Sequence, residues 1–381
     1  MRAAVAAFVG RRLSARPDVQ CRGLSFMARY DRYGPPQEVV KLEPLGKLPQ
    51  PEGCEVLVKF LAAPVNPADI NTVEGVYGIK NPLPSTPGNE GVGIVEAVGG
   101  SVSSLQVGDW VIPGLAGFGT WRSRALAKED DLIRVPNDIP VAYAATLAVN
   151  PSTAYRMLRD FRKLEPGDVV VQNGANSMVG YCVIQMARLM GLKTVNIIRS
   201  DRPQADQMLR LLSNLGGDLN VTDTYVNTPE FNQILRDMGG SKLAFNCVGG
   251  EIVTEMARSL DPGCTIVTYG GMSKRPMNIP YDLVTSKQIH LAGFWVTEWY
   301  KTNTRLARAV MIADIASMIR SDQLSLFLEL HDFDDFQHAL AISQQPFALR
   351  KVVLNMSHPD RLEEHDGKRT SDYDVFDTTT V

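Results

Sequence analysis

Long apolar runs and a strong charge of one sign are both absent from this 381-residue sequence. No uncharged run of about 18 or more apolar residues occurs, so no segment predicts a membrane-spanning helix. The net charge is only −3, and the basic balance of a nucleic-acid-binding domain is missing. We therefore expect neither a membrane span nor a nucleic-acid partner.

Cysteine and histidine are scarce, with five of each, and no group of them has metal-ligand spacing. The cysteines are odd in number and form no C-x-x-C motif, which argues against a disulfide framework and a zinc ribbon. The sequence also lacks H-E-x-x-H, G-x-S-x-G and G-K-[ST], which excludes the usual metalloproteases, serine hydrolases and Walker-type NTPases. We expect reduced thiols, an intracellular compartment and no metal site.

The two ends of the chain differ in charge. The first 22 residues contain five arginines and one aspartate among small and apolar residues, which is typical of a mitochondrial presequence. We predict a presequence over residues 1–24 and a location in the mitochondrial matrix; a solvated basic tail is the alternative. Residues 357–381 contain seven acidic and three basic residues and few aliphatic ones, which predicts a disordered acidic tail.

The rest of the chain divides into two modules, which suits its length. Residues 27–136 contain short β-like runs broken by glycine and proline. Residues 143–318 alternate apolar runs with helical windows, a pattern that predicts a parallel sheet covered on both faces. We place one domain at 25–150, completed by a returning strand, helix and strand within 320–356, and the second domain at 151–319.

A candidate nucleotide site lies between Asp168 and Gly191, where the sequence predicts a strand, the turn NGANSMVG and an amphipathic helix. Such a turn lets backbone N–H groups at the helix N-terminus approach a pyrophosphate. In the G-x-G-x-x-G register the three positions are Ala175, Ser177 and Gly180. Only one glycine is retained, so this motif alone is a weak indication.

The next predicted strand ends about 20 residues beyond Gly180, where an NAD enzyme usually has a carboxylate for the ribose. Here the strand ends in Arg199, followed by Ser200, Asp201 and Arg202. Guanidinium groups would pair with a 2′-phosphate, so NADPH is favoured over NADH. Asp201 weakens this argument, and two arginines that only solvate a loop are the alternative.

Several motifs in order resemble the medium-chain dehydrogenase/reductase superfamily: PSTPGNEGVGIVEAVG at 84–99, GDWVIP at 108–113, NPSTAYRML at 150–158 and QNGANSMVG at 172–180. The segments VYGIKNPLPSTPGNEG, IIRSDRP, YGGM and GFWV further resemble its mitochondrial trans-2-enoyl-thioester reductases. The resemblance covers most of the chain. It implies an α/β fold class, with a Rossmann doubly wound parallel sheet domain and a GroES-like, partly open β-barrel catalytic domain.

The resemblance also bears on the metal. Zinc alcohol dehydrogenases of the superfamily have G-H-E in the segment that corresponds to Gly88–Gly91, and Asn89 stands here in place of the metal-binding histidine. The four-cysteine structural-zinc loop is missing as well. The resemblance therefore implies the zinc-free branch.

The resemblance implies that Tyr77 is the catalytic tyrosine. Hydride transfer to Cβ of an enoyl thioester leaves an enolate that needs a hydrogen-bond donor and, at Cα, a proton. A phenol with an ordinary pKa of about 10 stays protonated and can serve both needs. Tyr77 lies in a predicted loop from Gly75 to Pro84; a tyrosine that only packs is the alternative.

Further family positions are implied to contact the cofactor. They are Asn150, Asn176, Ser177, Met178, Val179, Arg199, Asp201, Arg202, Tyr269, Gly270, Gly271, Met272, Phe294, Trp295, Val296 and Lys351. The family's arginine loop usually has R-D-R, whereas Ser200 is inserted here, so the partner of Arg199 stays open. For Trp295, a plain core position and a wall of the acyl pocket are the alternatives.

We interpret the chain as an NADPH-dependent reductase of trans-2-enoyl thioesters, carried on acyl carrier protein or coenzyme A, in mitochondrial fatty-acid synthesis. A zinc-free quinone or alkenal reductase is the nearest alternative, and a crystallin-like or partner-binding protein that holds NADPH without turnover is another. The apolar segment His290–Val296 would form an edge strand, which needs covering. This edge and the resemblance both predict a homodimer.

Overall fold

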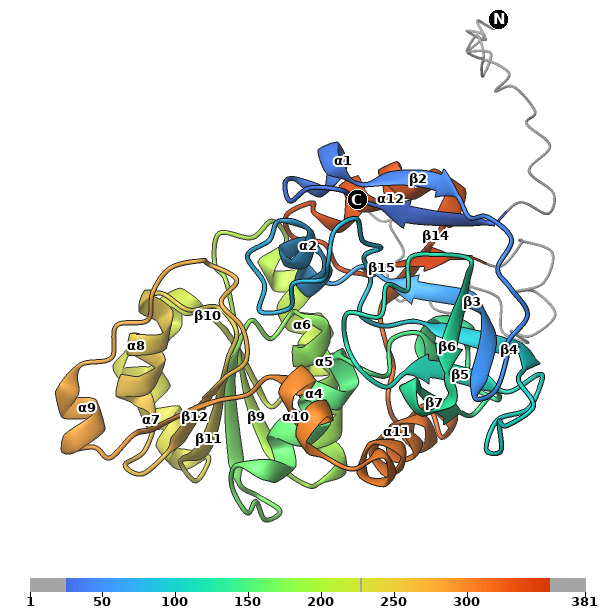
Figure 1. Cartoon of the computed structure of the whole chain (residues 1–381). Coiled ribbons are helices and arrows are strands. Elements are labelled where there is room, and N and C mark those ends of the chain that lie inside the picture. The colour runs from blue at the N-terminus through green and yellow to red at the C-terminus, as the bar shows by residue number, and fades with distance from the viewer. Residues whose placement is uncertain (1–24, 227, 357–381) are drawn as a thin grey trace, which may run out of the picture.

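Two domains lie side by side in the structure, a computed structural model that describes residues 25–226 and 228–356 (Figure 1). One domain contains a parallel sheet, and the other contains a mostly antiparallel sheet. The predicted presequence and the predicted acidic tail lie outside the described residues. The boundaries between the domains stay predictions.

The parallel sheet has six strands, in the spatial order β10-β9-β8-β11-β12-β13. Counted from β8, this order is 3-2-1-4-5-6, the order of a dinucleotide-binding Rossmann fold. The strands are β8 (Val169–Asn173), β9 (Lys193–Ile198), β10 (Leu219–Thr222), β11 (Ser241–Asn246), β12 (Thr265–Thr268) and β13 (His290–Gly293). The segment predicted as an edge strand therefore does end the sheet, at β13.

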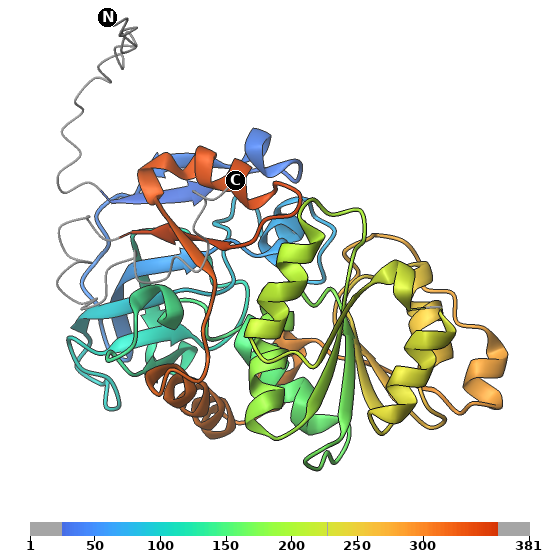
Figure 2. The same ribbon diagram turned by 180° about the vertical axis from the view of Figure 1, so that it is seen from behind.

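Helices cover both faces of this sheet (Figures 1 and 2). The helices that follow in this part of the chain are α4 (Asn150–Asp160), α5 (Met178–Leu189), α6 (Ala205–Asn214), α7 (Pro229–Asp237), α8 (Glu251–Ser259), α9 (Tyr281–Thr285), α10 (Val296–Thr302) and α11 (Arg305–Arg320), of which α11 packs against α4 and β7 instead of the parallel sheet. Along β8, Val170 belongs to the apolar cluster that contains α4 and α5, whereas Val169 and Val171 belong to the cluster that contains α7 and α8. Because both faces are buried, the first three residues of the strand are all valine, and the polar Gln172 and Asn173 stand only at its carboxyl end.

The second sheet has the order β14-β15-β3-β4-β5-β7, with β6 paired to β3 and a separate β1–β2 pair. Its strands are β1 (Phe26–Arg29), β2 (Lys41–Pro44), β3 (Glu55–Pro64), β4 (Val92–Val98), β5 (Trp110–Pro113), β6 (Arg124–Lys128), β7 (Leu132–Val135), β14 (Leu328–Asp332) and β15 (Lys351–Asn355). The nearby helices are α1 (Pro36–Val39), α2 (Pro67–Val73), α3 (Val141–Ala144) and α12 (Phe336–Ser343). Val353 of β15 lies opposite Pro64 of β3, so early and late parts of the chain share this sheet.

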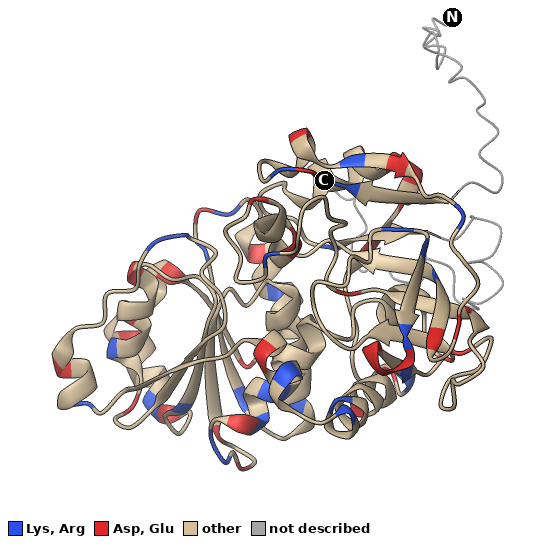
Figure 3. Ribbon diagram, in the orientation of Figure 1, with Lys and Arg blue, Asp and Glu red and all other residues tan. Residues whose placement is uncertain are grey.

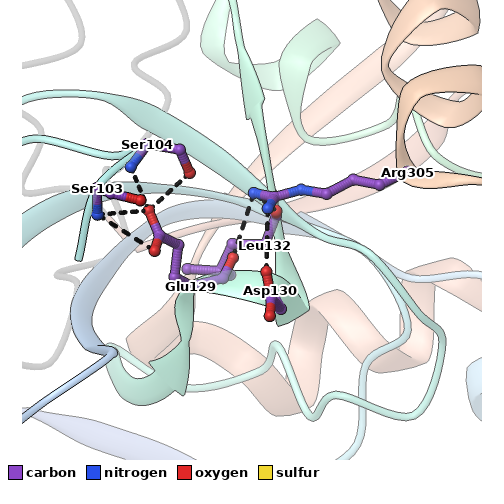
Figure 4. Close-up of polar contacts among 6 residues, drawn as sticks. All are labelled: Ser103, Ser104, Glu129, Asp130, Leu132 and Arg305. Carbon is purple, nitrogen blue, oxygen red and sulfur yellow. Dashed lines mark hydrogen bonds and ion pairs between the residues drawn. The ribbon is translucent and has the colours of Figure 1, made fainter. Parts of the chain in front are cut away.

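Helix α11 is fixed against the second sheet by its first residue (Figure 4). Arg305 donates hydrogen bonds to the carbonyl oxygens of Glu129, at 3.3 Å, and Leu132, at 2.9 Å, and pairs with Asp130 at 3.2 Å. The Ser104 hydroxyl and nearby backbone N–H groups donate to the Glu129 carboxylate and lower its pKa. The turn between β6 and β7 is thereby held on both sides.

The surface carries charge of both signs. Basic and acidic residues are interspersed over the two domains (Figure 3). Among the described residues, no helix has the length and apolar character needed to cross a membrane.

Candidate active site

The predicted cofactor contacts lie mainly at one edge of the parallel sheet. Parallel strands end at the same edge, so residues that directly follow different strands are brought together there. Asn176–Val179 follow β8, Arg199–Arg202 follow β9, Tyr269–Met272 follow β12, and Phe294–Val296 follow β13. The fold therefore gathers four segments that are widely separated in the sequence.

The turn after β8 shows what its glycines contribute. A Cβ on Gly180 would lie 2.4 Å from the carbonyl oxygen of Ala175, so helix α5 approaches the turn too closely for any side chain. Gly174 has a φ of 61°, and a Cβ there would lie 2.4 Å from the Cys247 Sγ. The Ser177 hydroxyl accepts a hydrogen bond from the Gly180 N–H at 3.1 Å and caps α5. The remaining N–H groups of the first turn can receive an anion.

The segment after β12 is tied to the end of β11. The Tyr269 N–H donates to the Asn246 carbonyl oxygen at 3.0 Å, and the Met272 N–H donates to the Cys247 carbonyl oxygen at 2.8 Å. The Tyr269 hydroxyl is buried beside Cys247 and Ser177, and burial raises its pKa well above the ordinary value. Met272, in contrast, is 62% exposed. Tyr269 thus packs its hydroxyl against the protein interior, whereas Met272 faces solvent.

The two arginines after β9 differ in exposure. The Arg199 side chain is 55% exposed and lies 3.6 Å from the Asp201 carboxylate. Arg202 is only 7% exposed, and its Nη2 donates to the carbonyl oxygen of Phe347 at 3.1 Å. The inserted Ser200 donates its N–H to a carboxylate directly after β10, at 2.9 Å. The structure thus shows that Asp201 is the group beside Arg199 and that Arg202 faces the other domain.

Tyr77 meets Trp295 between the two domains. Tyr77 lies in the loop between α2 and β4, and Trp295 directly precedes α10. The Trp295 Nε1–H donates to the Tyr77 Oη at 2.7 Å, and the two rings meet edge to face with their centroids 5.7 Å apart. Burial raises the pKa of Tyr77, and hydrogen bonds from Trp295 and Thr297 oppose this change. The phenol is therefore neutral at physiological pH, with its own O–H able to donate.

Asn150 and Lys351 share an acceptor that the sequence reasoning missed. The Asn66 Oδ1 accepts from the Lys351 Nζ at 2.8 Å and from the Asn150 Nδ2 at 3.2 Å. The Asn66 Nδ2 donates to the buried Glu90 carboxylate at 2.7 Å. Burial lowers the pKa of Lys351 and raises that of Glu90. This network connects β15, the start of α2 and the start of α4.

A sequence signal for Asn66 does exist. Asn66 begins the pattern N-P-A-D, and the structure forms a capping box in which Asp69 accepts from the Asn66 N–H at 2.8 Å. The pattern predicts a helix start, but it does not indicate that the capping side chain also contacts Lys351. Only the packing of β15 beside β3 brings those two residues together.

Asn89 is fully engaged with protein groups. Its Nδ2 donates to the Asp69 carboxylate at 2.6 Å, and its Oδ1 accepts from the Gly117 N–H at 2.8 Å. Burial raises the pKa of Asp69 to about 6. Within residues 25–226 and 228–356, no group of three His, Cys, Asp or Glu side chains could hold a metal ion. The amide at this position holds the loop around Gly117 instead.

Comparison with known families assigns the class. Residues 52–137 match the family model "Alcohol dehydrogenase GroES-like domain", and residues 179–311 match the family model "Zinc-binding dehydrogenase". Together with the two sheets and the strand-edge site, these matches define a dehydrogenase/reductase of the medium-chain type.

Comparison with individual proteins narrows the assignment from this class to one family. The chain is 44% identical over 355 residues to the mitochondrial enoyl-[acyl-carrier-protein] reductase of Xenopus tropicalis, a match that covers 92% of this chain and 100% of the relative. It is 45% identical to the enzyme of the same name from Homo sapiens, over 86% of this chain and 87% of that one. The chain belongs to the family of mitochondrial enoyl-[acyl-carrier-protein] reductases.

Solved structures agree with this assignment. The Etr1p/NADP/crotonyl-CoA complex superimposes with a TM-score of 0.80 at 35% identity and covers 87% of this chain and 99% of that one. A putative NADPH:quinone reductase from Bacillus thuringiensis gives a TM-score of 0.78 at 26% identity, over 88% and 99% of the two chains. The predictions of the family, the fold class, an enzyme and a mitochondrial location are confirmed. The roles of the individual site residues stay predictions.

Proposed function

We propose that the protein reduces trans-2-enoyl thioesters to saturated acyl thioesters with NADPH, as a step of mitochondrial fatty-acid synthesis. The observation that carries this proposal is the hydrogen bond from Trp295 to Tyr77, which holds a neutral phenol close to the strand edge. Reduction of an enoyl thioester creates an enolate that needs such a donor. The relatives' names, and the NADP and crotonyl-CoA in the Etr1p complex, agree with the predicted activity and cofactor.

The segments that follow the carboxyl ends of the parallel strands fit a phosphorylated dinucleotide. The glycines after β8 allow helix α5 to begin directly beside the turn, and no heavy atom lies within 4 Å of a Cβ built on Gly271. Backbone N–H groups within Asn176–Val179 would hold the pyrophosphate, except that of Ser177, which donates to the Gly174 carbonyl oxygen. Arg199 and Arg202 would pair with the 2′-phosphate. Tyr269–Met272 and Phe294–Val296 would line the cofactor between these points. When bound, NADPH supplies a hydride.

The chain's own residues would do the rest. Asn66 orients Asn150 and Lys351, which we place at the nicotinamide end of the cofactor. Trp295 fixes the Tyr77 oxygen, so the phenolic O–H can donate to the enolate oxygen as charge develops there. The same hydroxyl can deliver the proton that Cα requires.

A homodimer, and acyl carrier protein or coenzyme A as the thioester carrier, also belong to the proposal. Strand β13 ends the sheet, and Leu291 on it is 51% exposed, so an apolar edge is available for pairing with a second copy. The Etr1p/Etr2p structure from Candida tropicalis, with a TM-score of 0.79 at 34% identity, is described as a heterodimer.

We also propose domain boundaries at residues 150 and 319, which lie at the start of α4 and near the end of α11.

Oxidation of NADPH, followed by its absorbance, tests the proposed activity. Crotonyl-CoA and longer trans-2-enoyl thioesters should be reduced, and the same protein should be assayed with a panel of quinones and with NADH. Turnover of quinones without turnover of enoyl thioesters would indicate the quinone reductase alternative. Binding of NADPH without turnover of any acceptor would indicate a protein that only holds the cofactor.

A further inference from the structure

Phe347 connects the arginine loop after β9 to the other domain. It lies between α12 and β15, four residues before Lys351. The centre of the Arg199 guanidinium group lies 4.6 Å from the centroid of the Phe347 ring, and that of Arg202 lies 5.8 Å from it. The Phe347 carbonyl oxygen also accepts the hydrogen bond from Arg202. One residue of the catalytic domain therefore contacts both arginines that are predicted to recognise the 2′-phosphate.

The backbone of Phe347 is strained. Its φ of 64° lies in the left-handed region, which a bulky side chain rarely adopts and which glycine adopts freely. The position would thus be easier to build with glycine. Residues kept in such conformations are often found at functional sites, where the side chain provides something that the surrounding structure requires. At Phe347 the side chain provides an aromatic face for two cations.

Stacking leaves the arginine donors available for a ligand. A guanidinium group over an aromatic ring is attracted by the face of the ring, and this attraction uses none of its N–H donors as hydrogen bonds to another acceptor. Arg199 is largely exposed, and its nearest acidic group, Asp201, is 3.6 Å away. Within the described residues, the buried Nε of Arg202 has no hydrogen-bond partner. Both side chains therefore retain donors for a phosphate.

We propose that Phe347 is a positioning residue for recognition of the 2′-phosphate, because its ring orients Arg199 and Arg202 for charge-assisted hydrogen bonds to that group. The inference rests on the proposed function, and it makes the preference for NADPH depend on a residue outside the nucleotide-binding domain. The same segment leads directly into β15, whose first residue is Lys351, so a short stretch of chain links the arginine loop to the Lys351–Asn66 contact.

Calorimetric titration of the full chain with adenosine 2′,5′-bisphosphate, compared with adenosine 5′-diphosphate, tests this inference without turnover. Phe347→Gly should weaken binding of the 2′,5′-bisphosphate about two- to fivefold for each arginine that loses its stacking partner. Binding of the 5′-diphosphate should not change. Phe347→Tyr retains the aromatic face and should restore the preference. Pro346→Ala, an exposed neighbour, is the matched control and should bind as wild type does.

Thermal melting separates a positioning role from a merely structural one. Phe347→Gly relieves the left-handed strain but also makes the unfolded chain more flexible, so its melting temperature should stay close to that of wild type while the 2′-phosphate preference falls. An unchanged preference in Phe347→Gly would overturn the role of Phe347 and leave the proposed reductase standing. Equal weakening of both nucleotides together with a lower melting temperature would also overturn it. Equal binding of the two nucleotides by the wild-type protein would contradict the proposed recognition of the 2′-phosphate by Arg199 and Arg202.

Discussion

The indole N–H of Trp295 donates to the hydroxyl oxygen of Tyr77 at 2.7 Å, although 218 positions separate the two residues in the sequence. The bond joins the segment after β13 to the loop after α2. It fixes the phenol oxygen without using the phenolic proton. It also favours negative charge on that oxygen, which develops as the proton leaves.

Replacement of Tyr77 by phenylalanine should slow the reaction and leave the fold intact. The ring and its edge-to-face contact with Trp295 remain, but the donor to the enolate is lost. Loss of one such donor typically lowers kcat by about 10²–10³. Steady-state rates with a trans-2-enoyl thioester, together with fluorescence titration of NADPH, measure the two effects. Wild-type turnover in Tyr77→Phe would remove Tyr77 from the mechanism.

Trp295→Phe should raise the pKa of Tyr77, because the lost hydrogen bond favours the phenolate. If the protonated phenol is the active form, the alkaline limb of the pH–rate profile should move to higher pH. The rate at neutral pH should fall by roughly tenfold, the value of one ordinary hydrogen bond. Trp299→Phe is the control, since Trp299 packs against Arg156 instead. A limb that stays in place would contradict this role of Trp295.

The two arginines after β9 should respond differently to alanine. Arg199→Ala should weaken NADPH by about ten- to a hundredfold, leave NADH nearly unchanged and preserve the melting temperature, because Arg199 is exposed. Arg202→Ala should also lower the melting temperature, since this buried side chain bonds the Phe347 carbonyl oxygen. Fluorescence titration and thermal melting check both outcomes. Equal losses for NADPH and NADH in Arg199→Ala would show that Arg199 does not recognise the 2′-phosphate.

The edge strand β13 predicts a dimer at micromolar concentration. Leu291→Lys places a charge on this exposed apolar edge and should shift the protein toward the monomer in light scattering. Leu306→Lys is the matched control, because Leu306 is 73% exposed on α11 and should not affect association. Wild-type protein that scatters as a monomer would contradict the proposed interface.

Asp69 should make stability depend on pH. Burial raises its pKa to about 6 in the folded chain, above the ordinary value of about 3.9. Its contribution to the free energy of unfolding is therefore fully present below about pH 4 and is lost as the pH rises through about 6. Urea unfolding of wild type and Asp69→Asn across this range measures the difference between them. The free energy of unfolding of wild type, relative to that of Asp69→Asn, should fall as the pH rises. A difference that does not change with pH would contradict the raised pKa.

Much of the fold follows from local sequence. The alternation of apolar runs and helical windows predicts the parallel sheet because strands buried on both faces consist mainly of apolar residues. Gly180 is required by a close approach within one turn of chain, and Asn89 shows directly that the metal-binding histidine is absent. These features depend on residues that are close together in the chain, so they can be predicted from the sequence.

The candidate site is different, because its decisive contacts join distant segments. The sequence contains Tyr77, Trp295 and Lys351 but does not say that Trp295 bonds the phenol or that Lys351 meets Asn66. It also gives no sign that the Phe347 ring contacts Arg199 and Arg202. Local patterns of polarity decide which faces of strands and helices are buried. Only the packing of the two domains decides which buried faces meet, and with them which side chains form the site.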